Sequence, residues 1–215
     1  TAACQEAGMA LIGGETAQMS DVYAPGEYDL AGTIVGVVDE DRILDGRAIV
    51  PGDVLVGLPS SGLHTNGYTL ARKVLLEQAG LSLSDTPQGF TEPLGDALLA
   101  PHRSYLPEFI KAKDKVQIKG IAHITGGGFK GNIPRILPDQ CQAVIDTAAW
   151  TPPALFELIR EKGNIDTDEM YQVFNMGIGI IFMVNEADAG ILKTLWPDAV
   201  VIGTIQTGSG VSLKI

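Results

Sequence analysis

Residues 52–73 read GDVLVGLPSSGLHTNGYTLARK, and this stretch decides the fold class. The apolar run Val54–Leu58 has the length of a buried strand. The polar loop Ser60–Asn66 follows it, and a helix is predicted over Gly67–Gln78 because apolar residues recur there at helical spacing. A strand that leads through a polar loop into a helix indicates a domain in which helices are layered on a sheet.

The remainder of the chain continues this alternation of strands and helices. Strands are predicted at Ile118–Ile124, Ala143–Asp146 and Ile178–Val184, and at Val200–Ile205 with Val211–Ile215 as a closing pair. Helices are predicted over Leu94–Ala112 with a break at Pro101, and over Pro152–Lys162, Asp166–Phe174 and Glu186–Leu195. The mixed order, with several antiparallel joins, predicts α/β or α+β layers.

The first 47 residues are expected to belong to a different domain. A Pro-Gly turn within residues 48–53 marks the predicted boundary, so that residues 48–215 form a complete C-terminal α/β domain. Upstream, strands are predicted at Met9–Ile12 and Tyr28–Val38, and these cannot bury both of their faces alone. Because the chain also begins without a methionine, inside a predicted helix, we expect residues 1–47 to be the remnant of a truncated first domain.

Composition excludes several classes of protein. The net charge of −11, with 26 acidic against 15 basic residues, disfavours a nucleic-acid partner. The two cysteines, Cys4 and Cys141, have no CxxC spacing, so a reducing, cytoplasmic location is expected rather than a disulfide scaffold. No apolar run reaches the length of a membrane span, and the N-terminus lacks the basic region of a signal peptide.

The motif GGGFKG at residues 126–131 follows a predicted strand and precedes a predicted helix. It formally satisfies the dinucleotide pattern GxGxxG, and Asp146 stands about the right distance downstream. Pro134 and Pro138 leave little room for the crossover helix that such a fold requires, which argues against a nicotinamide cofactor. The favoured interpretation is a phosphate site, and a tight packing turn is the alternative.

The phosphate interpretation rests on backbone donors. The N–H groups of Gly126, Gly127 and Gly128 would bind the anion, with the hydroxyl of Thr125 and the imidazole of His123 nearby. Such N–H groups at a helix N-terminus bind anions whatever the overall charge of the protein, so the acidic composition does not exclude a local phosphate pocket.

The loop of residues 60–68 gathers polar side chains of several kinds. Ser60 and Ser61 offer hydroxyls, His64 an imidazole and Asn66 a carboxamide. Together they supply donors and acceptors for sugar hydroxyls, amides and phosphate. An ordinary loop in which Asn66 caps the following helix is the alternative.

Glu15 and Asn175 are the remaining candidate site residues. Glu15 follows two glycines, and a carboxylate there is a reasonable Mg²⁺ ligand, with a solvated loop acid as the alternative. Asn175 stands at a strand entrance, where two nearby glycines would let a backbone or a ligand approach closely. His102 and Arg103 are assigned no role beyond that of a surface pair.

The sequences of these segments and their order along the chain resemble those of one enzyme family. The segments are GGETAQMSDVY (13–23), EYDLAGTIVGVVD (27–39), GDVLVGLPSSGLHTNGYTLARK (52–73), IAHITGGGFKGNIPRILP (121–138) and EMYQVFNMGIG (169–179). The chain is similar throughout to the aminoimidazole ribonucleotide synthetases, also called phosphoribosylformylglycinamidine cyclo-ligases. Gln18, Ser20 and Thr65 depart from the residues usual in that family.

The resemblance implies a two-domain α/β fold that forms a homodimer through its first domain, and ATP-dependent closure of an imidazole ring in purine biosynthesis. It implies ATP and Mg²⁺ as cofactors and a ribonucleotide as substrate. The candidate residues are Glu15 for the metal, Ser61, Gly62, Asn66, Thr125, Gly126, Gly127, Gly128 and Asn175 for substrate, and His64 with His123 for proton transfer.

The family's nucleotide-binding segment has no counterpart in these 215 residues, so the polypeptide is expected to lack cyclisation activity by itself. Two alternative functions remain. One is the synthetase module of formylglycinamide ribonucleotide amidotransferase, which the compact chain end at Ile215 disfavours. The other is a non-catalytic module that binds a phosphorylated ligand.

Overall fold

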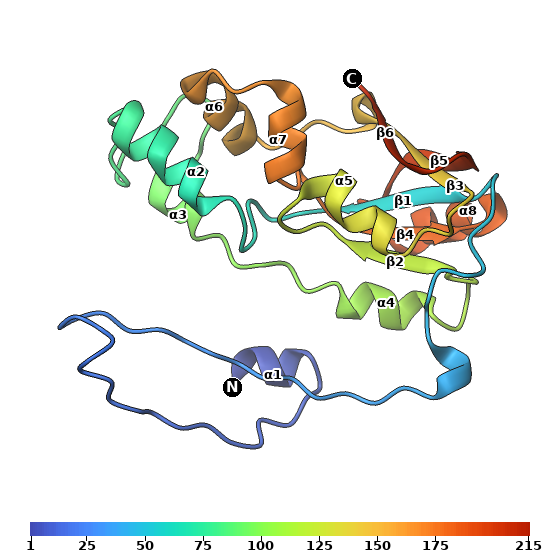
Figure 1. Ribbon diagram of the computed structural model, residues 1–215, viewed down its shortest axis with the longest axis horizontal. Coiled ribbons are helices and arrows are strands. Elements are labelled where there is room, and N and C mark those ends of the chain that lie inside the picture. Colours follow the sequence, from blue (N-terminus) through green and yellow to red (C-terminus); the bar gives the residue numbers. More distant parts are fainter. The chain divides into compact units, whose positions relative to one another are not determined.

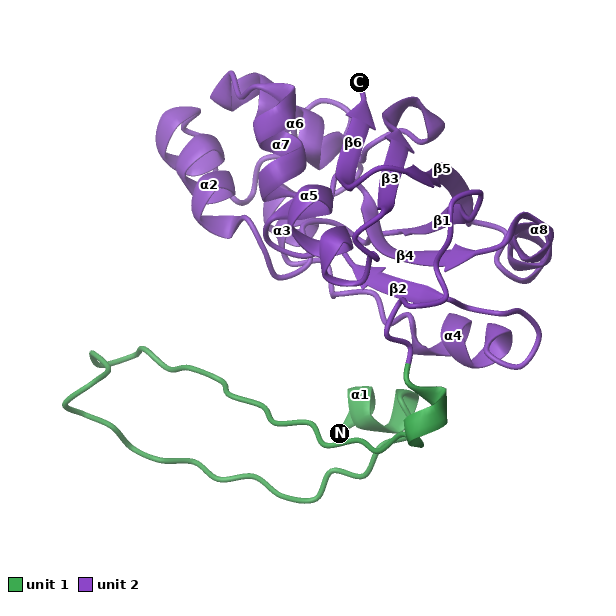
Figure 2. Ribbon diagram, turned by 45° about the vertical axis from the view of Figure 1, so that its right-hand side comes forward, with its two compact units in different colours: residues 1–43 green, residues 44–215 purple.

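The computed structural model describes residues 1–215, which divide into two compact units, residues 1–43 and residues 44–215 (Figure 2). Unit 2 contains every strand and all but two of the helical elements. None of the helices combines the length and the apolar character that a membrane crossing needs.

Unit 1 has little regular structure. It contains the helix α1 (Ala2–Glu6) and the 3₁₀ turn η1 (Glu40–Arg42), and the rest is irregular (Figure 1). The strands predicted at Met9–Ile12 and Tyr28–Val38 are absent, so that prediction is wrong. A strand needs a neighbour to receive its hydrogen bonds, and these segments have none within the unit. Their apolar side chains are correspondingly exposed, Ile12 to 93%.

Unit 2 is built on one six-stranded sheet of order β2-β4-β1-β5-β3-β6. The strands are β1 (Val54–Pro59), β2 (Gly120–His123), β3 (Cys141–Asp146), β4 (Ile178–Val184), β5 (Val200–Thr207) and β6 (Gly210–Lys214). All neighbours are antiparallel except β3 and β6, which are parallel. The expected α/β fold with antiparallel joins is confirmed.

The last two strands do not form the predicted closing pair, because β3 lies between β5 and β6. After β5 the chain crosses the start of β3 at Gly208, whose N–H donates to the carbonyl of Gln140. Gly208 has a φ of 151°, and a Cβ placed there would lie 3.0 Å from Cβ of Gln142. Glycine therefore permits a crossing that the apolar pattern of the two strands does not reveal.

The helices of unit 2 follow the predicted order with short irregular joins. They are α2 (Tyr68–Arg72), which continues as the π-helical η2 (Lys73–Gln78), α3 (Leu94–Leu98), α4 (Leu106–Ala112), α5 (Gly128–Asn132), the 3₁₀ turns η3 (Ile133–Arg135) and η4 (Thr147–Ala149), α6 (Ala154–Gly163), α7 (Thr167–Val173) and α8 (Glu186–Leu195). Asp166 and Asn185 accept hydrogen bonds from N–H groups in the first turns of α7 and α8, which fixes where these helices begin.

Both faces of the sheet are covered, which explains why β1 is apolar throughout. Val54, Val56 and Leu58 pack with side chains of α4 and α8 on one face. Leu55 belongs to a larger cluster on the other face, which includes side chains of α2, α5, α6 and α7. Figure 1 shows these helices arranged around the central strands.

Candidate functional site

The loop after β1 holds His64 in a strained conformation over β4. His64 has a φ of 59°, in the left-handed region that costs a non-glycine residue free energy, and its side chain is 4% exposed. Gly179 of β4 makes room for it, because a Cβ there would lie 2.7 Å from Cε1 of His64 and 2.0 Å from Oη of Tyr105. Strain of this kind persists only where the surroundings determine the conformation, and such places are often functional sites.

Asn175 is the residue that holds this loop. Its Oδ1 accepts from Oγ of Ser60 at 2.9 Å and from the N–H of Gly177 at 2.8 Å, and its Nδ2 donates to the carbonyl of Gly62 at 2.9 Å. Asn175 is buried, and three hydrogen bonds occupy its carboxamide. The carboxamide of Asn175 and the carbonyl of Gly62 thus have partners within the chain, and their binding of substrate stays a prediction.

Ser61 ties a second, distant segment to the loop. Its Oγ donates to the carbonyl of Pro101 at 2.6 Å and accepts from the N–H of Arg103 at 3.1 Å. The Arg103 guanidinium donates to the carbonyl of Pro59 and forms ion pairs with Asp198 and Glu108. These contacts fix residues 101–103 beside the loop, and they use the Ser61 hydroxyl that was predicted to face substrate.

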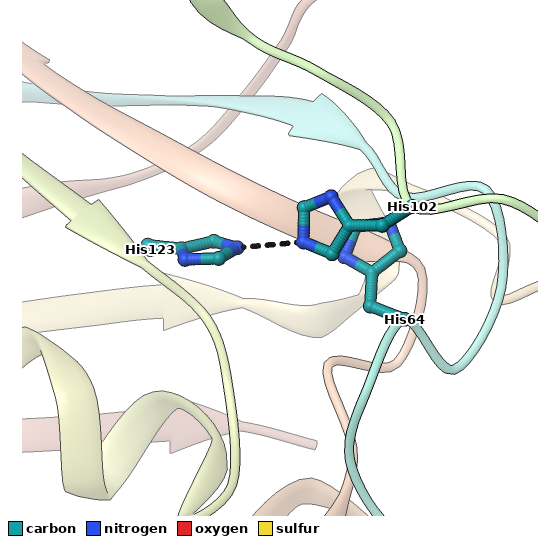
Figure 3. A group of neighbouring side chains, drawn as sticks. All are labelled: His64, His102 and His123. Atoms are coloured by element: carbon teal, nitrogen blue, oxygen red, sulfur yellow. Dashed lines mark hydrogen bonds between the residues drawn. The ribbon is translucent and has the colours of Figure 1, made fainter. Parts of the chain in front are cut away.

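His102 joins His64 and His123 in one cluster through this arrangement (Figure 3). The rings of His64 and His102 lie 3.9 Å apart between centroids, and Nε2 of His102 is 3.1 Å from Nε2 of His123. One nitrogen from each of the three rings lies within 4.8 Å of the others. The sequence had suggested only a surface pair for His102, and no local pattern connects it with histidines so far away in the chain.

When the three imidazoles are neutral, their hydrogen-bond partners assign the ring protons. Nδ1 of His102 lies 2.7 Å from the carbonyl of Arg103, so it donates and Nε2 carries the lone pair. Nε2 of His123 therefore donates to Nε2 of His102. Nε2 of His64 accepts from the N–H of Ser61 at 3.1 Å, which leaves the proton of His64 on Nδ1, buried without a partner.

The environment favours the uncharged forms of His64 and His123. Desolvation by burial, followed by the neighbouring His102, His123 and Arg103, lowers the pKa of His64 to about 4. Desolvation and His102 lower the pKa of His123 as well. At neutral pH both side chains are therefore uncharged, and His123, the more exposed of the two, has the character of an accessible base.

The glycine turn after β2 is organised by Asn132, which the sequence analysis did not single out. The Nδ2 of Asn132 donates to the carbonyls of Thr125, Gly126 and Gly128, and its Oδ1 accepts from the hydroxyl of Thr125 at 3.0 Å. The N–H of Gly128 donates to the carbonyl of Thr125. Of the predicted phosphate donors, only the N–H groups of Gly126 and Gly127 therefore remain without a partner in the chain.

The loop of residues 60–68 (the histidine loop) meets the glycine turn at one pocket of about 730 Å³, which none of the three histidines lines. Asn66 and Gly67 of the loop and Gly126 and Gly127 of the turn line one part of it. The rest is lined by α7 and its cap, with the side chains of Asp166, Asp168, Glu169, Gln172 and Val173. Donors for an anion and a group of carboxylates thus share this pocket.

Glu15 lies in unit 1, in a pocket of about 910 Å³ formed by residues 15–31 of its own loop. Glu27 and Asp29 line the same pocket. The oxygens of these three carboxylates do not gather at ligand distance of one another, so Glu15 as an Mg²⁺ ligand stays a prediction.

The strand order excludes the dinucleotide interpretation of GGGFKG. In such a fold the strand before the motif and the strand after the helix are parallel neighbours. Here β2 and β3 are separated by β4, β1 and β5. Asp146, the supposed ribose ligand, instead accepts from the N–H of Ala148 at the start of η4.

Comparison with solved structures agrees with this fold. The hydrogenase maturation protein HypE of E. coli is 20% identical, with a TM-score of 0.53 over 83% of this chain and 50% of that chain. Thiamine-monophosphate kinase of Stenotrophomonas maltophilia is 16% identical, with a TM-score of 0.53 over 82% of this chain and 54% of that chain. A HypE solved in complex with ATP is 16% identical, with a TM-score of 0.51 over 82% of this chain and 51% of that chain.

Sequence comparison is more specific. A phosphoribosylformylglycinamidine cyclo-ligase of Myxococcus xanthus is 49% identical over 211 residues, 96% of this chain and 61% of the relative. One of Bacillus pumilus is 46% identical over 213 residues, 97% of this chain and 62% of the relative. The chain thus spans about three fifths of the length of these relatives. The family described as AIR synthase related protein, C-terminal domain, matches residues 50–215. The chain belongs to the AIR synthase related family, with residues 50–215 as its C-terminal domain.

Proposed function

We propose that the protein that carries this chain uses ATP to convert formylglycinamidine ribonucleotide to aminoimidazole ribonucleotide. The observation that carries the proposal is the 46–49% identity to proteins named phosphoribosylformylglycinamidine cyclo-ligase. The meeting of the histidine loop and the glycine turn at one pocket supports it. A phosphorylated small molecule needs anion donors together with a few convergent polar groups, and this pocket combines them.

In the proposed reaction, the amide oxygen of the substrate receives a phosphoryl group from ATP. The amidine nitrogen of the substrate then attacks the activated carbon, and the former amide oxygen leaves as part of inorganic phosphate. The attacking nitrogen must lose a proton as the ring closes. His123 is suited to accept it, because its lowered pKa leaves it unprotonated and its Nδ1 is free when Nε2 donates to His102. We assign this role to His123 rather than to the buried His64.

The substrate phosphate is assigned to the N–H groups of Gly126 and Gly127, with Asn66 as a further polar contact. The carboxylates of α7 and its cap on the pocket wall would repel a phosphate at short range. A bound cation would offset this repulsion. We propose Mg²⁺ as this cation, which would neutralise charge on the transferring phosphoryl group. The proposal of Glu15, in unit 1, as an Mg²⁺ ligand rests on the resemblance to the enzyme family alone.

The remaining proposals concern the whole protein. ATP binding follows from the resemblance to the enzyme family, and a HypE with a similar fold has been solved in complex with ATP. We also propose a cytoplasmic location and a homodimer, both of which follow from the resemblance to the enzyme family.

The test is an assay on the full-length gene product that contains this sequence. With ATP, Mg²⁺ and formylglycinamidine ribonucleotide, it should form an aromatic amine that diazo coupling detects, together with equal amounts of ADP and phosphate. Omitting ATP should abolish the product. ATP hydrolysis without formation of the amine, or with an unrelated acceptor only, would reject the proposed function.

Glycine substitutions test the phosphate assignment. Gly127→Ala would place a methyl group at the pocket and should raise the KM for the substrate roughly tenfold or more, through about 1.4 kcal/mol of lost binding. Gly127 has a φ of 92°, so alanine there also strains the backbone. Gly80→Ala is the matched control, because Gly80 has a φ of 66° and no atom within 4 Å of a placed Cβ. An equal change in KM for both variants would contradict the assignment.

A further inference from the structure

We propose that His64, His102 and His123 form a binding site for a late first-row divalent metal ion such as Zn²⁺. The cluster is distinct in chemistry from the carboxylate pocket of Glu15, and the proposal does not depend on the proposed function. It rests on the spacing of the nitrogens, on the hydrogen bond that orients His102, and on the unpartnered nitrogen of His64.

The spacing already approaches that of a tetrahedral site. Zinc–imidazole bonds of about 2.0–2.1 Å place the nitrogens of two ligands roughly 3.3 Å apart. Nε2 of His102 and Nε2 of His123 are 3.1 Å apart, and all three ligand nitrogens lie within 4.8 Å of one another. Small side-chain movements would therefore bring all three to bonding distance, once the ring proton of His123 has moved from Nε2 to Nδ1. Figure 3 shows His123 pointing toward His102, and the ring of His64 lies next to that of His102.

His102 has the outer contact that is typical of a metal ligand. A histidine that binds a metal through one nitrogen usually donates the other N–H to a carbonyl or carboxylate, which fixes the ring. Nδ1 of His102 donates to the carbonyl of Arg103 in this way at 2.7 Å, and so directs the Nε2 lone pair toward the cluster. Arg103 is itself fixed by ion pairs with Asp198 and Glu108.

The unpartnered nitrogen of His64 is evidence for a bound metal that does not depend on the spacing of the three rings. Its Nδ1 is buried, has no hydrogen-bond partner, and belongs to a side chain that is only 4% exposed. Such a group costs free energy unless something binds it. Coordination through Nδ1 moves the ring proton to Nε2, and the hydrogen bond from the N–H of Ser61 must then open. Because Ser61 is exposed, water can take over this N–H. Loss of the hydrogen bond from the N–H of Ser61 to His64 is therefore the change expected when all three histidines bind the metal.

The donor set predicts which ions bind. The three ligands are imidazole nitrogens, which suit Zn²⁺, Co²⁺ and Ni²⁺, whereas Mg²⁺ prefers oxygen. His102 and His123 are exposed, so the fourth position would be open to solvent. The proposed metal site should therefore keep one coordination position open to solvent, unlike a structural zinc site, in which the protein supplies all four ligands.

The test is a titration of the 215-residue chain with Co²⁺ and Zn²⁺ in a Cys4→Ser background, which removes the more accessible thiol as a competing ligand. We expect one Co²⁺ per chain with the intense visible bands of four-coordination, displacement by one Zn²⁺, and no displacement by Mg²⁺. His102→Gln and His123→Gln should each weaken Zn²⁺ binding roughly a hundredfold, the share of one ligand in a typical zinc site. Glu169→Gln, in the pocket lined by α7, is the matched control and should bind as the parent does.

Tryptophan fluorescence checks that each variant is folded, since both tryptophans lie in unit 2. In the amide spectrum, the N–H of Ser61 should shift on Zn²⁺ addition in the parent chain and remain unchanged in His64→Gln. Binding that survives loss of His102 or His123, or a six-coordinate cobalt spectrum, overturns the proposal. Binding that is lost without these two histidines but leaves Ser61 unmoved overturns the assignment of His64 as a ligand.

Discussion

Replacing Gly179 with alanine should destabilise unit 2 by about 3 kcal/mol. The added Cβ would lie 2.0 Å from Oη of Tyr105 and 2.7 Å from Cε1 of His64, against ordinary contacts of roughly 3.5 Å. Tyr105 must retreat by more than 1 Å, and its hydrogen bond to the carbonyl of Pro59, 2.9 Å long, would break. Overpacking costs about 1–3 kcal/mol, and a lost buried hydrogen bond adds about 1 kcal/mol.

Urea unfolding followed by tryptophan fluorescence measures this loss, because Trp150 and Trp196 both belong to unit 2. With a urea dependence of roughly 3 kcal/mol per molar, the midpoint should fall by about 1 M. The matched control is Gly190→Ala, in the exposed part of α8, where nothing lies within 4 Å of a placed Cβ. Alanine there should stabilise the helix by about 0.5–1 kcal/mol.

A double-mutant cycle isolates the contact itself. Tyr105→Phe deletes the oxygen that the new methyl group would strike, so the double variant should cost about 1 kcal/mol less than the sum of the two single variants. Additive costs would refute the idea that Gly179 exists to make room for Tyr105. A Gly179→Ala midpoint within 0.2 M of the parent, on the order of 0.5 kcal/mol, would refute the packing argument as a whole.

Three further predictions concern stability and pH. Lys119→Met should cost about 3–5 kcal/mol in urea unfolding, because it leaves the buried Asp53 carboxylate without the ammonium 2.5 Å away, and adding Asp53→Asn should restore part of the loss. Asn132→Ala should cost about 3 kcal/mol, since it removes the hydrogen bonds to three carbonyls of the glycine turn and the acceptor of the Thr125 hydroxyl; a loss below about 1 kcal/mol would show that water replaces it. The pKa of His64 is lowered from 6.5 to about 4, so the unfolded chain binds more protons between these values, and the stabilisation present above pH 6.5 is lost as the pH falls toward 4. The wild type should therefore lose up to roughly 3 kcal/mol more than His64→Gln between pH 7 and pH 4, and equal losses would contradict the lowered pKa.

The elements of unit 2 could be predicted because their local signals agree with their environment. The run Ile178–Val184 is apolar at every position and is buried between two layers of helices. Glu186–Leu195 begins at an asparagine cap and has helical periodicity, and both of its ends are as predicted. The strands predicted in residues 9–12 and 28–38 carry similar local signals, but hydrogen-bond partners are absent from their own unit, and partners cannot be read from the segment itself.

The site could be predicted only in part, for a comparable reason. The motifs around His64 and Gly126 stand out because polar and glycine residues follow apolar strands. His102 stands in a segment with no motif, and the hydrogen bonds of Ser61 to residues 101 and 103, with that of Arg103 to Pro59, place it beside His64. Asn132 is likewise an ordinary helix residue in the sequence, and its four hydrogen bonds become visible only in three dimensions.

The meeting of the two loops follows from strand directions rather than from either motif. β1 and β2 are both antiparallel to β4 and lie on opposite sides of it, so they run in the same direction and end at the same edge of the sheet. Pro59 at the end of β1 pairs with Ile178, and His123 at the end of β2 pairs with Ile180, both near the start of β4. The loops that leave β1 and β2 therefore emerge on either side of the segment that enters β4, where Asn175 and Gly179 stand. Any substitution that shifted the register of β4 would move the loop after β1, the loop after β2 and the segment that enters β4 together. The geometry of the site therefore depends on β4 more than on any single candidate catalytic residue.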